Sequence, residues 1–167
     1  MVTNKIQQHE KPALTENDGA TEHLRPGAPL EDYLPYQLFR IVNRLTLNLR
    51  EDFRPLKITL ARWRVLSTLT ASNGRSIGQL ASFMVMEQPA LSRVIDQMER
   101  DRLVVRRLAS EDNRVVRVYL TAAGRHKFEE IRPLEIRHYK NVIDGIDQSD
   151  LEQLSGLLHT VWQNIEC

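Results

Sequence analysis

The sequence predicts a mainly α-helical fold with one small β-hairpin, which is an α+β class. Apolar residues recur at the three- and four-residue spacing of an amphipathic helix over most of the chain after residue 30. Residues 103–120 change period and form two short apolar runs separated by a polar cluster. The length of 167 residues, 41% of them hydrophobic, suits one domain with a core of its own.

The first 30 residues differ from the rest of the chain and predict a flexible arm, because apolar residues are sparse there. The turn-forming residues of this arm are Pro12, Gly19, Pro26, Gly27 and Pro29. A helix of about 20 residues is expected from Glu31 to Pro55. Pro35 suits its first turn, where a missing N–H group costs nothing. Its apolar residues are Leu34, Leu38, Phe39, Ile41, Val42, Leu45 and Leu49.

One further helix and then two short helices in tandem are expected in the middle of the chain. The further helix begins after Thr59, a good N-cap residue, and ends at Asn73-Gly74. Ser76 can cap the first short helix, and Pro89 suits the first turn of the second. A tight connection over residues 84–86 joins the two short helices, so the pair has the outline of a helix-turn-helix.

A β-hairpin is expected directly after this helix pair. Residues 103–108 indicate one strand, residues 110–113 form a polar turn, and residues 115–120 alternate between two faces. A hairpin that follows a helix-turn-helix gives the outline of a winged helix. Residues 58–121 are therefore the expected winged helix-turn-helix domain.

Two more helices are expected after the hairpin. Thr121 can cap the first, Pro133 predicts a kink or a break inside it, and Gly145 marks its end. Asp147 or Ser149 can cap the last helix, which carries a strong apolar stripe. The residues of the stripe are Leu151, Leu154, Leu158, Val161, Trp162 and Ile165.

The net charge of +1 conceals a segregation of charge along the chain. Residues 59–121 hold ten basic and six acidic side chains, and all ten bases are arginine. Residues 122–167 hold five basic and eight acidic side chains. The planar guanidinium of arginine suits phosphates and base edges better than lysine does, so the middle segment is a candidate nucleic-acid surface. If charge alone is considered, the alternative explanation for the basic excess in residues 59–121 is ordinary variation in composition.

Motifs of common enzymes and metal sites are missing from the sequence. It has no glycine-rich phosphate loop, no G-x-S-x-G elbow and no H-E-x-x-H motif, and its five histidines do not pair at helical spacing. We therefore expect neither an enzyme nor a metal or other cofactor. The single cysteine, Cys167, suits a reducing compartment. No signal peptide and no apolar run of about 20 residues is found, so a cytoplasmic location away from membranes is expected.

Polar residues gather at the start of the second short helix. Gln88, Pro89, Ser92 and Arg93 lie on its first turns, and the first turns of a recognition helix face base edges in the major groove. Glutamine pairs with adenine, arginine with guanine or phosphate, and serine with either. These four residues are candidate contacts to double-stranded DNA. The alternative is that Gln88 and Ser92 are only solvated cap residues.

The expected hairpin is rich in arginine. Its candidate DNA contacts are Arg106, Arg107, Asp112, Arg114 and Arg117. Arginine at a hairpin tip can enter the minor groove, where A·T tracts concentrate negative potential. The aspartate can accept a backbone N–H group of the turn or hold an arginine in place. Alone, such residues would most often form a solvated hairpin face, but their place after a helix-turn-helix favours DNA.

Together these residues resemble the multiple-antibiotic-resistance regulator (MarR) family of bacterial winged-helix transcription factors. Residues 112–121 match in full the family's wing signature, D-x-R-x-x-x-V-x-L-T. Residues 88–93 and 102–104 and Gly124 also resemble the family, and the resemblance covers roughly residues 31–166. One departure is Val85, because many members have glycine before the recognition helix.

The resemblance implies a homodimeric DNA-binding regulator. In this family the first helix and the last two form a dimerisation domain, here residues 31–57 and 122–167, beside the DNA-binding domain 58–121. The apolar stripes of these helices are too rich for one small winged helix to bury, which agrees with a dimer. Family members commonly repress palindromic operators and are released when a small aromatic or phenolic ligand binds between the two domains.

Four residues are candidates for lining such an effector site: Tyr36, Phe39, Arg40 and Trp63 combine aromatic surface with a cation for a carboxylate. The alternative for Phe39 and Trp63 is a place in the core. For the chain as a whole, the alternative function is a winged-helix module that binds proteins and no specific DNA.

Overall fold

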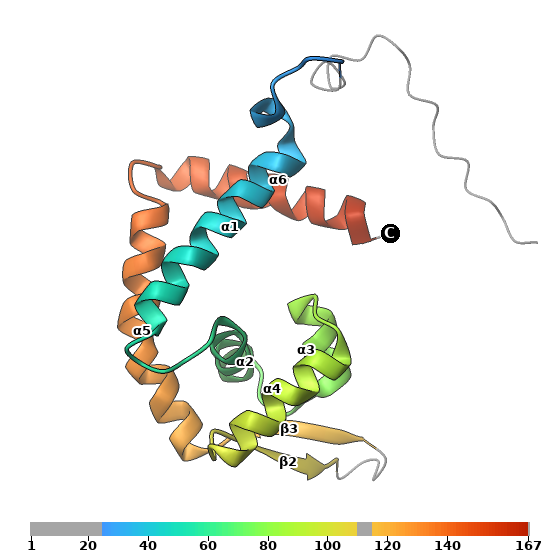
Figure 1. Cartoon of the computed structure of the whole chain (residues 1–167), viewed down its shortest axis with the longest axis vertical. Helices are drawn as coiled ribbons and strands as arrows, with labels where there is room; N and C mark the ends of the chain where they lie inside the picture. Colours follow the sequence, from blue (N-terminus) through green and yellow to red (C-terminus); the bar gives the residue numbers. More distant parts are fainter. Residues whose placement is uncertain (1–24, 110–114, 167) are drawn as a thin grey trace, which may run out of the picture. The chain divides into compact units, whose positions relative to one another are not determined.

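A computed structural model of the protein describes residues 25–109 and 115–166. These residues form helices and a small three-stranded antiparallel sheet, which confirms the expected fold class (Figure 1). The chain forms two compact units, and the boundary between them falls inside the first long helix, between Thr46 and Leu47. Most of the expected N-terminal arm lies outside the described residues.

The first unit contains a 3-10 helix, Leu30–Asp32, and most of α1, Leu34–Phe53. Pro35 lies in the first turn of α1, as the sequence predicts. None of residues 25–46 is buried. Four large apolar side chains of this part of α1 are 50–62% exposed: Leu34, Phe39, Ile41 and Val42. Among the described residues, these four side chains form an exposed apolar face on α1.

The second unit contains the helix-turn-helix and the helix that precedes it, and two of these three helices begin at the expected caps, Thr59 and Ser76. Helix α2 spans Leu60–Ala71, α3 spans Ile77–Met84 and α4 spans Gln88–Arg100. The Thr59 hydroxyl accepts the N–H group of Arg62, and Ser76 forms a capping box with Gln79. Each cap satisfies a backbone donor that the first helical turn leaves without a partner.

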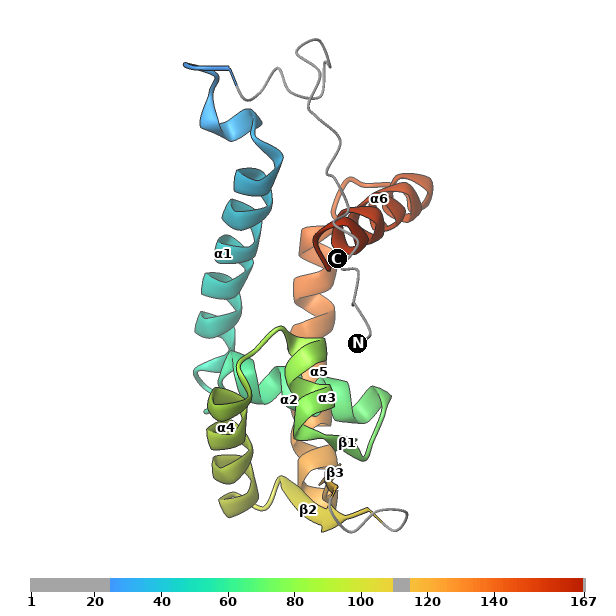
Figure 2. The same ribbon diagram turned by 90° about the vertical axis from the view of Figure 1, so that its right-hand side faces the viewer.

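The sheet consists of β1, Arg75–Ser76, β2, Val104–Leu108, and β3, Val116–Leu120. Its order is β1-β3-β2, with both pairs antiparallel, and Arg107 lies opposite Arg117 in the hairpin. Figure 2 shows the hairpin following the end of α4. The sequence predicts the hairpin but not β1, which has only two residues and therefore no alternation to detect.

One core joins α2, α3, α4, β2, β3 and the helix Ala122–Val142 (α5) of the second unit, and Phe53 at the end of α1 and Ile131 on α5 belong to it. The core residues of the winged helix include Leu66, Leu69, Leu80, Leu91, Ile95, Met98 and Val118, all completely buried. At Gly124 a β-carbon would lie 2.0 Å from the carbonyl oxygen of Leu103. Only glycine therefore allows α5 to pack so closely on the chain that leads into β2.

Two long helices complete the second unit, α5 (Ala122–Val142) and α6 (Gln148–Glu166). Of the kink or break expected at Pro133, the break is wrong, because α5 continues through this residue. Residues 129, 130, 132 and 133 are exposed, so water can hydrate the carbonyl group that lacks a donor. Asp147 caps α6 by accepting the N–H group of Asp150 at 2.9 Å. Among the described residues, no helix is long and apolar enough to cross a membrane.

Candidate nucleic-acid interface

The turn between α3 and α4 contains a valine in the left-handed region. Val85 has φ +49° and ψ +57°, and its N–H group donates to carbonyl groups at the end of α3. A β-branched residue is strained in this conformation, which glycine adopts freely. The departure from the usual glycine therefore leaves the turn intact at a cost in local strain. From α2, Arg64 donates to the carbonyl oxygen of Met84, and burial lowers the pKa of this guanidinium.

Helix α4 presents its polar first turns to solvent and its apolar residues to the core. Gln88, Pro89 and Arg93 are exposed, and Ser92 is half-buried. The opposite face is anchored by Leu91, Ile95 and Met98, which are completely buried. The four residues expected to contact DNA are thus brought together at the start of one well-anchored helix. Such a helix can place its first turns against base edges without losing its packing.

The arginines of the hairpin differ in their surroundings. Arg107 is exposed, with its guanidinium 5.7 Å from the centre of the Tyr119 ring. Arg117 is half-buried and donates from Nη1 to the carbonyl oxygen of Gly74 at 3.1 Å, which ties β3 to the chain before β1. Asp112 and Arg114 lie outside the described residues.

Arg106 forms ion pairs with two carboxylates of α4. Its Nη1 lies 2.6 Å from Oε2 of Glu99, and its Nη2 lies 2.6 Å from Oδ1 of Asp96. Burial opposes the charge of Arg106, but the hydrogen bonds to Glu99 and Asp96 outweigh it and raise the pKa of the guanidinium. The backbone N–H of Arg106, which donates to Glu99, is the main cause that lowers the pKa of Glu99.

The two acidic partners of Arg106 were not predicted as part of the site. The sequence does contain an indication of these partners, because Asp96 and Glu99 are three residues apart and therefore share one face of α4. Their pairing with a strand residue depends on how α4 packs against β2, which local sequence does not specify. The sequence therefore identified the arginine but not its partners.

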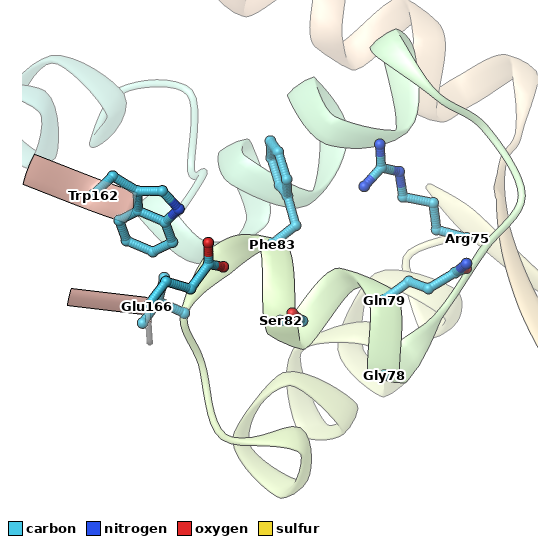
Figure 3. A pocket seen from close by; sticks show the side chains of 8 residues that line it. Arg75, Gly78, Gln79, Ser82, Phe83, Trp162 and Glu166 are labelled. Carbon is cyan, nitrogen blue, oxygen red and sulfur yellow. The ribbon is translucent and has the colours of Figure 1, made fainter. Parts of the chain in front are cut away.

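A cleft of about 750 Å³ lies between α3 and the C-terminal part of α6. Figure 3 shows Phe83 and Trp162 around it, with Arg75 on the far side of Phe83 from Trp162. The Arg75 guanidinium lies 5.0 Å from the centre of the Phe83 ring. The cleft is lined by Arg75, Gly78, Gln79, Ser82, Phe83, Val85, Trp162 and Glu166. None of the four expected effector residues is among them.

The expected effector residues fall in both units of the chain. Tyr36, Phe39 and Arg40 belong to the first unit, where the Arg40 guanidinium lies 5.9 Å from the centre of the Tyr36 ring. Trp63 belongs to the second unit and packs against the core, with its ring centre 5.6 Å from that of Phe53. Within the described part of the chain, its buried Nε1 has no hydrogen-bond partner, and neither has Oγ of Ser67 one turn later.

These elements define a winged helix-turn-helix protein with a polar recognition helix. The sequence pattern of the MarR family matches residues 58–116. A MarR-family transcriptional regulator from Silicibacter pomeroyi, known from its crystal structure, is 35% identical with a TM-score of 0.75, and the match covers 82% of this chain and 92% of that one. The chain therefore belongs to the MarR family of transcriptional regulators, as the sequence resemblance implied.

Other relatives match this chain at lower identity. The HTH-type transcriptional repressor IacR of Pseudomonas putida is 25% identical over 150 residues, which are 90% of this chain and 87% of that protein. MepR of S. aureus, solved in complex with DNA, is 18% identical with a TM-score of 0.70, covering 78% of this chain and 96% of that one. BpsR of Bordetella bronchiseptica, whose DNA binding is regulated by 6-hydroxynicotinic acid, is 22% identical with a TM-score of 0.69, covering 77% and 98%.

Proposed function

We propose that this regulator is a homodimeric repressor that binds a palindromic operator and is released by a small aromatic acid. The DNA-binding part of this proposal rests on one observation, that α4 has a buried apolar face and an exposed polar face. Its buried residues fix the helix in the core, while Gln88 and Arg93 extend into solvent from its first turns. In a helix-turn-helix these positions face the base edges of the major groove.

Several of the candidate residues have distinct proposed roles in DNA binding. Gln88 and Arg93 supply donors and acceptors to bases or phosphates, Ser92 adds a hydroxyl group, and Pro89 fixes the start of α4. In the wing, the exposed Arg107 and the signature residue Arg114 are the proposed contacts to the minor groove and its phosphates. Asp112 is proposed to orient the wing turn. These assignments give residues 58–121 the role of DNA-binding domain.

Homodimer formation is supported by apolar side chains on α1 and α6 that no other part of the described chain covers. On α6, Leu154, Leu157, Leu158, Trp162 and Ile165 are 40–70% exposed. An apolar face of this extent in a soluble protein marks an interface. We assign dimerisation to residues 31–57 and 122–167. A twofold dimer presents two copies of α4, which suits half-sites about 34 Å apart.

The effector is proposed to contact Trp63 and Ser67 from α2. Tyr36, Phe39 and Arg40 of the first unit are separate candidates for contacts to an aromatic acid. The indole N–H group and the hydroxyl group are buried donors that a ligand's carboxylate or phenol could satisfy. BpsR, a relative that shares the fold, responds to an aromatic acid. A ligand acts by binding one arrangement of the two recognition helices more tightly than the other, with a coupling of about 1–3 kcal/mol.

Footprinting of the full-length protein on the DNA upstream of its own gene tests this function. We expect a protected site with twofold symmetry that shrinks or disappears when 6-hydroxynicotinic acid or benzoate is added. Light scattering on the same sample should give the mass of a dimer. A protein-interaction module would instead leave the DNA unprotected at every position, and its weak DNA affinity would depend little on sequence.

A further inference from the structure

We propose that Arg106 is a positioning residue, which locks the recognition helix α4 to the wing strand β2 and does not itself contact DNA. This inference rests on the proposed function, because it concerns the two elements that are proposed to read DNA. It reassigns a residue whose position in an arginine-rich wing favours a direct DNA contact.

The geometry fixes Arg106 to α4 at several points. Nη1 and Nη2 each lie 2.6 Å from a different carboxylate, those of Glu99 and Asp96. The backbone N–H of Arg106 donates to Oε1 of Glu99 at 2.9 Å, so Glu99 binds both the main chain and the side chain of this residue. Nη2 also lies 3.5 Å from the carbonyl oxygen of Ser92, one turn nearer the start of α4.

This arrangement differs from an ordinary surface ion pair. An isolated exposed pair contributes little, because solvent screens it and two long side chains lose freedom. Here one planar guanidinium holds two carboxylates, its side chain is only 22% exposed, and a backbone hydrogen bond fixes the register. Asp96 and Glu99 are three residues apart, so one guanidinium can engage both.

The next residue on β2 shows the contrast. Successive residues of a strand point to opposite faces, so Arg107 points away from the face that Arg106 uses for α4. Arg107 is exposed, and within the described residues its guanidinium lies near the Tyr119 ring and pairs with no carboxylate. Two adjacent arginines are thereby divided between two tasks: Arg106 holds the protein together and Arg107 is available to phosphate.

The attachment of α4 to β2 through Arg106 has a consequence for DNA recognition. The recognition helix and the wing are proposed to enter different grooves of one duplex, so the angle between them must match the spacing of those grooves. Arg106 fixes that angle. Loss of the lock should therefore reduce discrimination between operator and unrelated DNA more than it reduces binding to DNA in general.

The test compares full-length variants by fluorescence anisotropy on the footprinted operator and on a scrambled duplex, over a range of salt concentrations. The variants are Arg106→Gln, Arg106→Lys and the double variant Asp96→Asn/Glu99→Gln. Arg107→Gln serves as the example of a lost phosphate contact. Arg132→Gln on α5, whose side chain is 57% exposed, controls for the loss of one positive charge. Circular dichroism establishes that each variant is folded.

For a positioning role, Arg106→Gln, Arg106→Lys and the double variant should each lower the operator-to-scrambled affinity ratio by roughly tenfold. The salt dependence should stay unchanged in Arg106→Gln but decrease by about one unit of slope in Arg107→Gln. Arg106→Lys keeps the charge, so its loss of discrimination points to geometry.

A direct DNA contact predicts the opposite result, and that result would overturn the proposal. Arg106→Gln would then lower the salt slope by about one unit. Arg106→Lys would retain discrimination, and the double variant would bind the operator more tightly because the arginine is released. If the wild-type protein shows no preference for the operator, the proposed function itself fails, and this outcome is distinct from either result for Arg106.

Discussion

The strained valine in the helix-turn-helix allows a direct stability test. In Val85→Gly, the left-handed conformation of residue 85 becomes unstrained, which removes about 1–2 kcal/mol of unfavourable free energy. Glycine also makes the unfolded chain more flexible, which costs about 0.5–1 kcal/mol. Val85 is 69% exposed, so little apolar burial is lost. The expected net effect is a gain of roughly 0.5–1 kcal/mol in unfolding free energy.

Chemical and thermal denaturation at one fixed protein concentration measure this effect, because a dimer's stability depends on concentration. The midpoint temperature should rise by about 1–3 °C. Val116→Gly is the matched control, since Val116 is also partly exposed but lies in β3, and this variant should be less stable than the wild type. If Val85→Gly is destabilised as much as the control, the strain at Val85 is not real and the reasoning is refuted.

Three further predictions concern packing, charge and assembly. Gly124→Ala should destabilise the fold by about 1–3 kcal/mol in denaturant titrations, because a β-carbon there would overlap the Leu103 carbonyl; an unchanged midpoint would contradict the close packing of α5. Burial raises the pKa of Glu135 in the folded protein, so its ionisation destabilises the fold increasingly as the pH rises above the pKa of a glutamate in the unfolded chain. Glu135→Gln should therefore be more stable than wild type at pH 7, with the advantage lost below about pH 4, whereas an equal advantage at both pH values would exclude this cause. Leu158→Asp in α6 should yield monomers in light scattering at micromolar concentration, and a dimer of unchanged affinity would remove α6 from the proposed interface.

Local signals explain why much of the fold could be predicted from the sequence. Thr59, Ser76 and Thr121 all cap helices as expected, because a capping side chain bonds to a backbone group only a few residues away. The hairpin could be predicted because residues 115–120 alternate between two faces. The predicted break at Pro133 was wrong because water around α5 can hydrate the carbonyl group that lacks a hydrogen bond. Strand β1 was not predicted because two residues are too few to show an alternation of apolar and polar residues.

The candidate site was only partly predictable for a related physical reason. Gln88 and Arg93 were identified from their place at the start of a helix, which a sequence specifies well. Arg106 is paired with α4 whereas Arg107 is exposed, and this difference arises from the packing of β2 against α4. Neither charge nor spacing along the hairpin distinguishes the two arginines.

The central claim is that the first turns of α4 read a specific DNA sequence. The most direct measurement is the affinity of the wild-type protein and of Arg93→Ala for the footprinted operator and for a scrambled duplex of the same composition at one salt concentration. The wild type should prefer the operator by about a thousandfold or more, and Arg93→Ala should lose roughly tenfold of that preference. Equal wild-type affinity for both duplexes would contradict the claim.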